Sequence, residues 1–141
     1  IGGESSGGLA VRGHIAGKDG IYAAALLVEM LAVTGKSVSQ LYREITDKYG
    51  MLYYEDAAFT MTQARKAELQ EKLFVKLEVP DFGNTVEKIN RTDGCKVYFT
   101  DGSWVICRFS GTEPLLRMAA EADEQAEAER CIRVWRTFLS L

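Results

Sequence analysis

Two arginines and two hydroxyl residues surround a glycine in the run Arg108-Phe109-Ser110-Gly111-Thr112-Glu113-Pro114-Leu115-Leu116-Arg117. We expect a β-strand to end at Arg108. Gly111 should then turn the backbone through angles that other residues avoid, so that successive N–H groups point into one concavity. Hydroxyl groups donate to phosphate oxygens, and a guanidinium group binds an oxyanion through a planar fork. The pattern therefore predicts a phosphate-binding loop formed by Arg108, Ser110, Gly111, Thr112 and Arg117.

The same residues also suit an ordinary tight turn between two strands. In that interpretation Glu113 pairs with one of the arginines and Pro114 fixes the exit of the chain. Ser-Gly-Thr turns are common, so the spacing by itself leaves the two interpretations even.

A glycine-rich segment, residues 1 to 8, brings four glycines together with one carboxylate and two hydroxyl groups. Such groups suit the hydroxyls of a sugar ring, although composition alone favours a flexible linker. The segment that follows, residues 12 to 20, adds His14, Lys18 and Asp19. His14 suits a hydrogen bond that fixes the loop, and Asp19 suits the cap of the next helix.

These three segments together resemble the α-D-phosphohexomutases, the phosphoglucomutase and phosphomannomutase family. Residues 108 to 117 are similar to the phosphate-binding loop of the family's C-terminal domain, with Phe109 where the family often has proline. The first segment resembles the sugar-specificity loop Gly-Glu-x-Ser-Gly, and the second resembles Gly-His-Ile-x-x-Lys-Asp-Gly. The resemblance implies that Glu4 and Ser6 contact the hexose hydroxyls and that Lys18, with His14 as a further candidate, approaches the sugar or its phosphate.

The resemblance also implies an activity. Members of the family interconvert hexose 1-phosphate and hexose 6-phosphate through a phosphoserine, with Mg²⁺ and with hexose 1,6-bisphosphate as intermediate or activator. Such chemistry needs a nucleophile, a cation at the transferring phosphoryl group and a distant anchor for the other phosphate. The chain has no Ser-His pair like the phosphoserine loop and no Asp-x-Asp-x-Asp run like the metal loop, so we expect no catalytic residue and no metal ligand in it.

We therefore expect the substrate-binding C-terminal half of a phosphohexomutase, inactive alone and dependent on the N-terminal domains of the same enzyme. Its substrate would be a glucose or mannose phosphate, because the amino-sugar mutases usually carry a different specificity loop. The chain begins without methionine, which also suggests a fragment. A stand-alone phosphosugar-binding module without catalysis is the alternative.

Composition narrows the class of protein further. The chain has 141 residues, 47% hydrophobic and 26% charged, and its net charge of −3 comes from mixed signs, so we expect neither a nucleic-acid nor a membrane partner. The longest apolar run, 21 to 33, contains Glu29 and is too short to cross a bilayer. Three cysteines without CxxC spacing and a single histidine favour reduced structural thiols over a zinc site and suggest a cytoplasmic protein.

The expected fold is α+β in two parts, with a boundary near residue 60. Residues 1 to 59 suit the C-terminal fragment of the family's third domain, with a largely apolar helix at 20 to 33 and a second helix at 37 to 49. The second helix opens with the capping pattern Ser37-x-x-Gln40. Residues 51 to 60 are expected to form an extended bridge between the parts. Because the first helix would expose a large apolar surface, we expect it to pack on the second part or on another copy of the chain.

Residues 60 to 141 suit the family's fourth domain, a four-stranded antiparallel sheet with helices on one face. We expect a helix at 63 to 74 that Thr62 caps and a terminal helix that Asp123 caps. Strands are expected at 85–91, 96–100, 103–109 and 115–122. A two-residue turn at Asp101-Gly102 would pair Thr100 with Ser103. In that register Ile106 and Trp104 lie on the buried face, and Cys95 and Cys107 lie on opposite faces, which argues against a disulfide.

Overall fold

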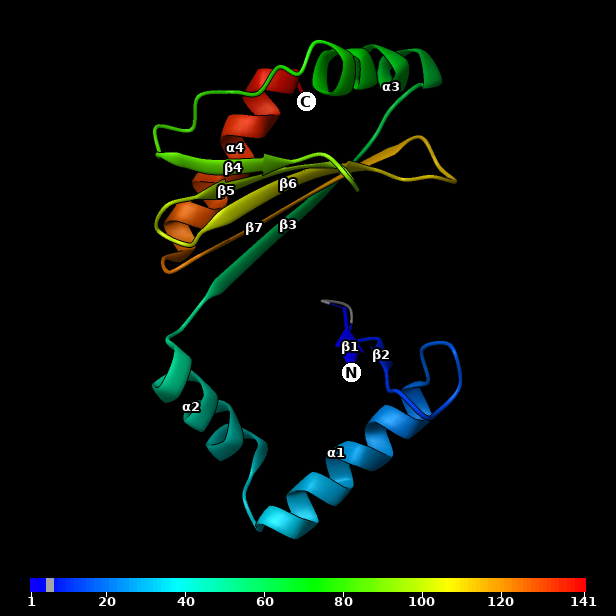
Figure 1. Ribbon diagram of the computed structural model, residues 1–141, viewed down its shortest axis with the longest axis vertical. Helices are drawn as coiled ribbons and strands as arrows, with labels where there is room; N and C mark the ends of the chain where they lie inside the picture. Colours follow the sequence, from blue (N-terminus) through cyan, green and yellow to red (C-terminus); the bar gives the residue numbers. More distant parts are fainter. Residues whose placement is uncertain (5–6) are drawn as a thin grey trace. The chain divides into compact units, whose positions relative to one another are not determined.

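The computed structural model describes residues 1–4 and 7–141 and divides them into two compact units, Ile1–Gly50 and Met51–Leu141 (Figure 1). The first unit contains a two-stranded antiparallel ribbon and two helices: β1 (Gly2–Gly3), β2 (Leu9–Ala10), α1 (Gly20–Thr34) and α2 (Val38–Tyr49). No single helix in the described ranges is long and apolar enough to cross a membrane. The pair α1 and α2 passes that test together but is bent by 85° at the break between them.

Both helices of the first unit begin where the sequence predicts. The carboxylate of Asp19 accepts hydrogen bonds from the first N–H groups of α1, and Ser37 and Gln40 form the expected capping box of α2. Neither helix has a buried residue, and several apolar side chains of α1 are strongly exposed, including Ile21, Val28 and Val33.

The second unit is an antiparallel sheet with helices, which confirms the α+β class. The strand order is β3-β7-β6-β5-β4. Its elements are β3 (Tyr53–Thr60), α3 (Gln63–Gln70), the π-helical turn η1 (Glu71–Val75), β4 (Val86–Asn90), β5 (Cys95–Phe99), β6 (Trp104–Phe109), β7 (Leu115–Ala122) and α4 (Gln125–Leu139).

The sheet has five strands, not the four that we expected. The fifth is β3, the segment that we predicted to be a bridge, and all eight of its residues pair with β7. An extended run rich in Tyr, Phe and Ala pairs readily with an open strand edge, because each pairing satisfies backbone groups that would otherwise face water.

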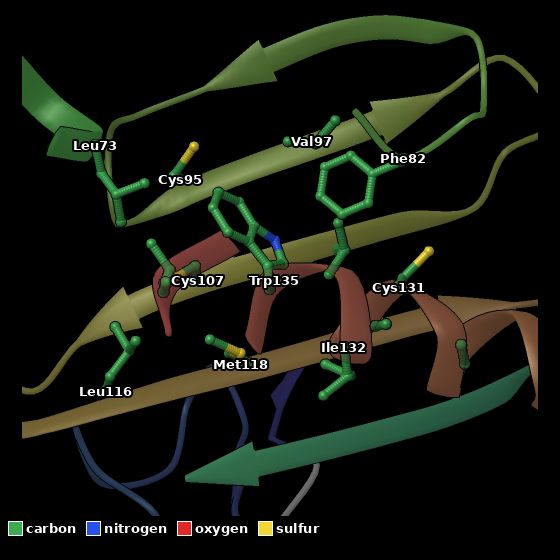
Figure 2. Close-up of a cluster of buried hydrophobic side chains, with 14 of the residues drawn as sticks. Leu73, Phe82, Cys95, Val97, Cys107, Leu116, Met118, Cys131, Ile132 and Trp135 are labelled. Carbon is green, nitrogen blue, oxygen red and sulfur yellow. The ribbon is translucent and has the colours of Figure 1, made fainter. Parts of the chain in front are cut away.

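The helices cover one face of this sheet, as expected. Trp135 and Ile132 of α4 lie over Val97, Cys107 and Met118 of three different strands (Figure 2). Leu69 of α3 and Leu73 of η1 complete the same core. Burying one such side chain stabilises the fold by about 1.5–3 kcal/mol, so this core holds the helices against the sheet.

The predicted register of the β5–β6 hairpin is wrong by one residue. Phe99 N donates to Ser103 O at 2.9 Å and Gly102 has a φ of 92°, so the loop has three residues with glycine in the left-handed position. A one-residue shift moves every side chain to the other face. Val105 therefore points into the core, while Trp104 and Ile106 lie on the helix-free face.

The shift also changes the position of the cysteines. Cys95 pairs directly with Cys107, and both side chains are buried in the core under the helices. Both are free thiols, but our reason for expecting that, their placement on opposite faces, is wrong. Burial raises the pKa of both thiols, which keeps them protonated at neutral pH.

One predicted cap is also wrong. The residue that precedes α4 in the cap position is Glu124, not Asp123, and its side chain makes no capping hydrogen bond.

Candidate functional site

The predicted phosphate-binding loop connects β6 to β7 at one end of the sheet (Figure 1). A backbone hydrogen bond of 2.8 Å from Ser110 N to Leu115 O closes its base. The segment between β3 and α3 also holds it, because Met61 N donates to Pro114 O at 2.9 Å. The loop is thus fixed at both ends by backbone contacts.

Two hydroxyl groups and two unpaired backbone amides lie within this loop. The Oγ of Ser110 accepts a hydrogen bond from Glu113 N at 3.3 Å and lies 3.5 Å from the Oγ1 of Thr112. Within residues 1–4 and 7–141, neither Gly111 N nor Thr112 N donates to an acceptor. The loop therefore presents consecutive unpaired donors, as an anion site requires.

The backbone of Gly111 differs from our expectation. Its φ is not in the left-handed region, and a Cβ at this position would meet no atom within 4 Å. Neither backbone strain nor packing inside the chain therefore requires glycine here. The absence of a side chain instead leaves room for a ligand to approach the loop amides.

The two arginines of the predicted site lie directly opposite each other. Arg108 on β6 pairs with Arg117 on β7, so both side chains leave the helix-free face of the sheet next to the loop. Both are exposed. Like charges in directly opposed positions repel each other and destabilise the sheet, and a bound anion would relieve that repulsion.

Only one of these arginines has an ion-pair partner among the described residues. Arg108 Nε lies 3.1 Å from a carboxylate oxygen of Asp93, in the turn between β4 and β5. The alternative in which Glu113 pairs with an arginine is therefore not observed. Arg117 makes no ion pair or side-chain hydrogen bond in the described part of the chain, and its guanidinium group remains available to a ligand.

Sequence reasoning missed one residue that contacts the loop. Lys66, on α3, donates through Nζ to Ser110 O at 2.7 Å and lies 3.4 Å from Glu113 O. Lys66 and Ser110 are 44 residues apart in the sequence, so no local sequence pattern predicts this contact. Only the tertiary fold shows it.

The predicted sugar-binding residues belong to the first unit. Lys18 Nζ donates to a carboxylate oxygen of Glu4 at 2.8 Å, so these two candidates lie together. The stem of Lys18 passes 2.5 Å from the place where a Cβ on Gly8 would be, so only glycine leaves it this path. Ser6, the third candidate, lies outside the described residues.

His14 makes the loop-fixing contact that the sequence suggested. Its Nε2 lies 2.8 Å from a carboxylate oxygen of Asp19, and its ring stacks on Tyr22 with the centroids 4.0 Å apart. The hydrogen bond with His14, helped by the backbone N–H of Tyr22, holds the pKa of Asp19 below its usual value. His14 thus fixes the start of α1.

The cavity that adjoins α4 and the loop are separate features of the second unit. A surface cavity of about 540 Å³ lies between residues 79–81 and α4, and its lining includes no predicted site residue. Within the described ranges, no group of three or more His, Cys, Asp or Glu residues could hold a metal ion. The described residues therefore do not fit a Mg²⁺ site.

The fold and the loop together define a class of protein: an α+β domain with unpaired backbone donors and two exposed arginines at one end of an antiparallel sheet. Residues 1–49 match the family domain described as "Phosphoglucomutase/phosphomannomutase, alpha/beta/alpha domain III". Residues 58–134 match "Phosphoglucomutase/phosphomannomutase, C-terminal domain". The chain belongs to the phosphoglucomutase/phosphomannomutase family.

Individual relatives agree with this assignment. The chain is 32% identical over 134 residues to a "Phosphoglucomutase/phosphomannomutase" of Thermococcus kodakarensis, and this match covers 95% of this chain and 27% of the relative. It is 39% identical over 109 residues to a "Probable phosphoglucosamine mutase" of Methanosarcina acetivorans, covering 77% of this chain and 22% of the relative. The chain thus spans about a quarter of the length of the curated relatives that it matches.

Solved structures show the same fold. A phosphoglucomutase/phosphomannomutase family protein from Burkholderia thailandensis superposes with a TM-score of 0.68 at 23% identity, covering 98% of this chain and 27% of the other.

Proposed function

We propose that this chain is the substrate-binding part of a phosphohexomutase and that residues 110–114 hold the phosphate of a hexose 1-phosphate or hexose 6-phosphate. The observation that carries the proposal is the pair of opposed arginines, Arg108 and Arg117, beside two unpaired loop amides. A sheet gains nothing from opposed like charges, whereas a phosphate dianion would bind both. Family membership supports the same conclusion.

The proposed reaction belongs to the whole enzyme. In it a phosphoserine gives its phosphoryl group to one end of the sugar and recovers one from the other end through a bisphosphate intermediate. The loop would anchor whichever phosphate is not reacting, which lowers the entropic cost of bringing the other end to the nucleophile. Magnesium and the nucleophile would come from the N-terminal domains, so we expect the chain alone to be inactive.

The first unit would hold the sugar. Glu4 and Lys18 are polar, exposed and joined by an ion pair, and both have donors or acceptors that suit ring hydroxyls. Glucose and mannose are the hexoses that we propose. The names of the relatives also include glucosamine, so the amino sugar belongs in the test.

Calorimetric titration of the chain with glucose 6-phosphate tests the proposal. We expect weak binding that falls as the salt concentration rises, because exposed charges are screened. The double variant Arg108→Ala/Ser110→Ala should abolish it. A matched variant, Arg133→Ala/Ser140→Ala, removes the same groups from α4 and its C-terminal end and should bind as the unchanged chain does.

Parallel titrations with mannose 6-phosphate, glucosamine 6-phosphate and inorganic phosphate would divide the affinity between phosphate and sugar. Equal binding of glucose 6-phosphate by the unchanged chain and the Arg108/Ser110 variant would contradict the proposed site.

A further inference from the structure

Lys66 makes the side-chain contacts that join α3 to the phosphate-binding loop. Its ammonium group donates to the carbonyl oxygen of Ser110 at 2.7 Å and lies 3.4 Å from that of Glu113. These carbonyls belong to the first residue of the loop and to the residue before Pro114, so a single side chain holds both halves of the loop. Hydrogen bonds from a charged donor are about twice as strong as neutral ones.

The base of this contact is rigid. Leu69 on the same helix is buried in the core, and Met61, just before α3, donates from its backbone to the loop at Pro114. Arg65, the neighbour of Lys66 in α3, donates to Leu139 O at the end of α4. Lys66 is therefore presented to the loop from a helix that the core and the end of α4 hold in place.

Peptide geometry converts this contact into an orientation of the loop amides. In a trans peptide the C=O and the following N–H point in opposite directions, and the described residues contain no cis peptide. Because the carbonyl of Ser110 points at Lys66, the N–H of Gly111 points away from it. That N–H is one of the two amides that donate to no described acceptor.

The ammonium group also acts on the charge distribution of the loop. A cation at the carbonyl oxygen of a peptide polarises the whole unit and strengthens the donor character of its N–H. Lys66 thus both directs the Gly111 amide outward and makes it a better donor to an anion.

We propose that Lys66 is a positioning residue of the phosphate site, which holds the loop in its anion-binding conformation without touching the phosphate. This inference rests on the proposed function for its ligand, but the orientation of the loop amides is measurable without one. A direct contact between Lys66 and phosphate is the competing arrangement, and the experiment separates the two.

The experiment uses the full chain and three variants. Lys66→Met keeps the approximate length of the side chain but removes its charge and its hydrogen-bond donors. Lys66→Arg keeps the charge and the donors. Lys72→Met is the matched control, because Lys72 makes the same kind of bond from the neighbouring turn, donating to Phe138 O at 3.0 Å, but does not contact the loop. Amide resonances of Gly111 and Thr112 are recorded by ¹⁵N NMR without ligand and during titration with inorganic phosphate.

We expect Lys66→Met to shift the ligand-free resonances of Gly111 and Thr112 and to weaken phosphate binding about tenfold or more. Lys66→Arg should restore affinity to within about threefold, and Lys72→Met should leave both readouts unchanged. Rescue by Lys66→Arg would show that the loss in Lys66→Met does not come from general unfolding. The Lys72→Met variant checks the same point, because it also removes a lysine that bonds to a backbone carbonyl.

Three results would overturn the inference. The first is equal phosphate binding by Lys66→Met and Lys72→Met. The second is a Lys66→Met variant whose ligand-free resonances of Gly111 and Thr112 do not shift. The third is a Lys66→Met variant that loses phosphate affinity although those resonances stay in place. The last result would assign Lys66 a direct contact with phosphate. If the unchanged chain bound no phosphate, the proposed function would fail, and the ligand-free resonances would still decide the role of Lys66.

Discussion

At the scale of single residues, the arginine pair is where function and stability oppose each other. Arg108 has a carboxylate partner in Asp93, whereas Arg117 has no ion-pair partner among the residues that the structure describes. The repulsion between two directly opposed charges is tolerable in an exposed sheet, where it costs only about 0.2–1 kcal/mol. A binding site is a sufficient reason to retain it.

Replacing Arg117 with Gln should therefore have two opposite effects. We expect the free energy of unfolding in urea to rise by about 0.2–1 kcal/mol because the repulsion is removed. Phosphate affinity should fall about tenfold or more, because a charge-assisted hydrogen bond is lost. Arg133→Gln, on α4, is the control that should change neither quantity by much. A variant of Arg117 that is less stable and still binds phosphate normally would show that the arginine is structural.

A second residue-scale prediction concerns Glu127 on α4. Its carboxylate binds the guanidinium of Arg130, and that hydrogen bond, with one from Asn84, lowers the pKa of Glu127 to about 2. A lowered pKa stabilises the folded chain above the ordinary pKa of a glutamate. The contribution is lost as the pH falls from about 4.5 toward 2.

We expect Glu127→Gln to lower the free energy of unfolding at pH 7 by about 1–2 kcal/mol, which allows for screening by solvent at a partly exposed site. The difference from the unchanged chain should narrow steadily below pH 4.5. Urea titrations between pH 7 and pH 3 measure it, with Glu129→Gln as the exposed control. A difference that stayed constant across this range would mean that the carboxylate carries no shifted pKa.

At the scale of elements, two glycines in the turns of the sheet are required for different reasons. Gly102 and Gly94 both adopt a left-handed φ, at 92° and 96°, in the two hairpins beside β5. A Cβ at Gly102 would meet no neighbour, whereas a Cβ at Gly94 would lie 2.8 Å from Cys107 O and 3.0 Å from the Cβ of Arg108. An alanine at Gly102 would therefore add backbone strain alone, whereas an alanine at Gly94 would add backbone strain and a steric clash.

We expect Gly102→Ala to destabilise the chain by about 1 kcal/mol, the cost of the left-handed conformation. Gly94→Ala should cost about 2–3 kcal/mol, since it adds a clash with backbone atoms of β6. Thermal or urea unfolding of both variants gives the comparison. Equal losses, or a greater loss at Gly102, would contradict the described hairpin geometry.

These turns also show which parts of the fold the sequence predicts. Helix starts at Asp19, Ser37 and Thr62 carry local capping signals, and the structure confirms all three. The Asp101-Gly102 pair, however, suits both a two-residue and a three-residue loop, and only packing against α4 selects the second. One residue of error there moved Trp104 and Cys107 to the wrong faces.

The candidate site also has parts that local sequence predicts and parts that depend on tertiary contacts. Its loop was visible because Ser110, Gly111 and Thr112 are adjacent in the sequence. Asp93 and Lys66, which hold Arg108 and the loop carbonyls, are distant in sequence and carry no motif. The pairing of β3 with β7 was missed for the same reason: strand partners are chosen by tertiary contact.

At the scale of the whole molecule, the exposed helix α1 is the feature that most needs explanation. Ile21 is 86% exposed, Val33 80% and Val28 65%, and no residue of α1 is buried. Apolar surface of this extent normally lies against another surface. We predict that the isolated chain self-associates through α1.

Light scattering measures this association directly. Val28→Lys/Val33→Lys should reduce the apparent molar mass toward that of a monomer. The control Ser39→Lys/Asp47→Asn, which adds the same charge to α2, should leave the mass of the unchanged chain. If the unchanged chain were monomeric at high concentration, the prediction would be refuted.

We propose above all that the backbone amides of Gly111 and Thr112, together with Arg108 and Arg117, bind phosphate. The most direct test is an ¹⁵N NMR titration of the full chain with glucose 6-phosphate, following Gly111 N–H, Thr112 N–H and the Nε–H groups of Arg108 and Arg117. We expect saturable shifts at these four groups with a single dissociation constant. A folded chain whose saturable shifts lie elsewhere, or that shows none at the loop, would contradict it.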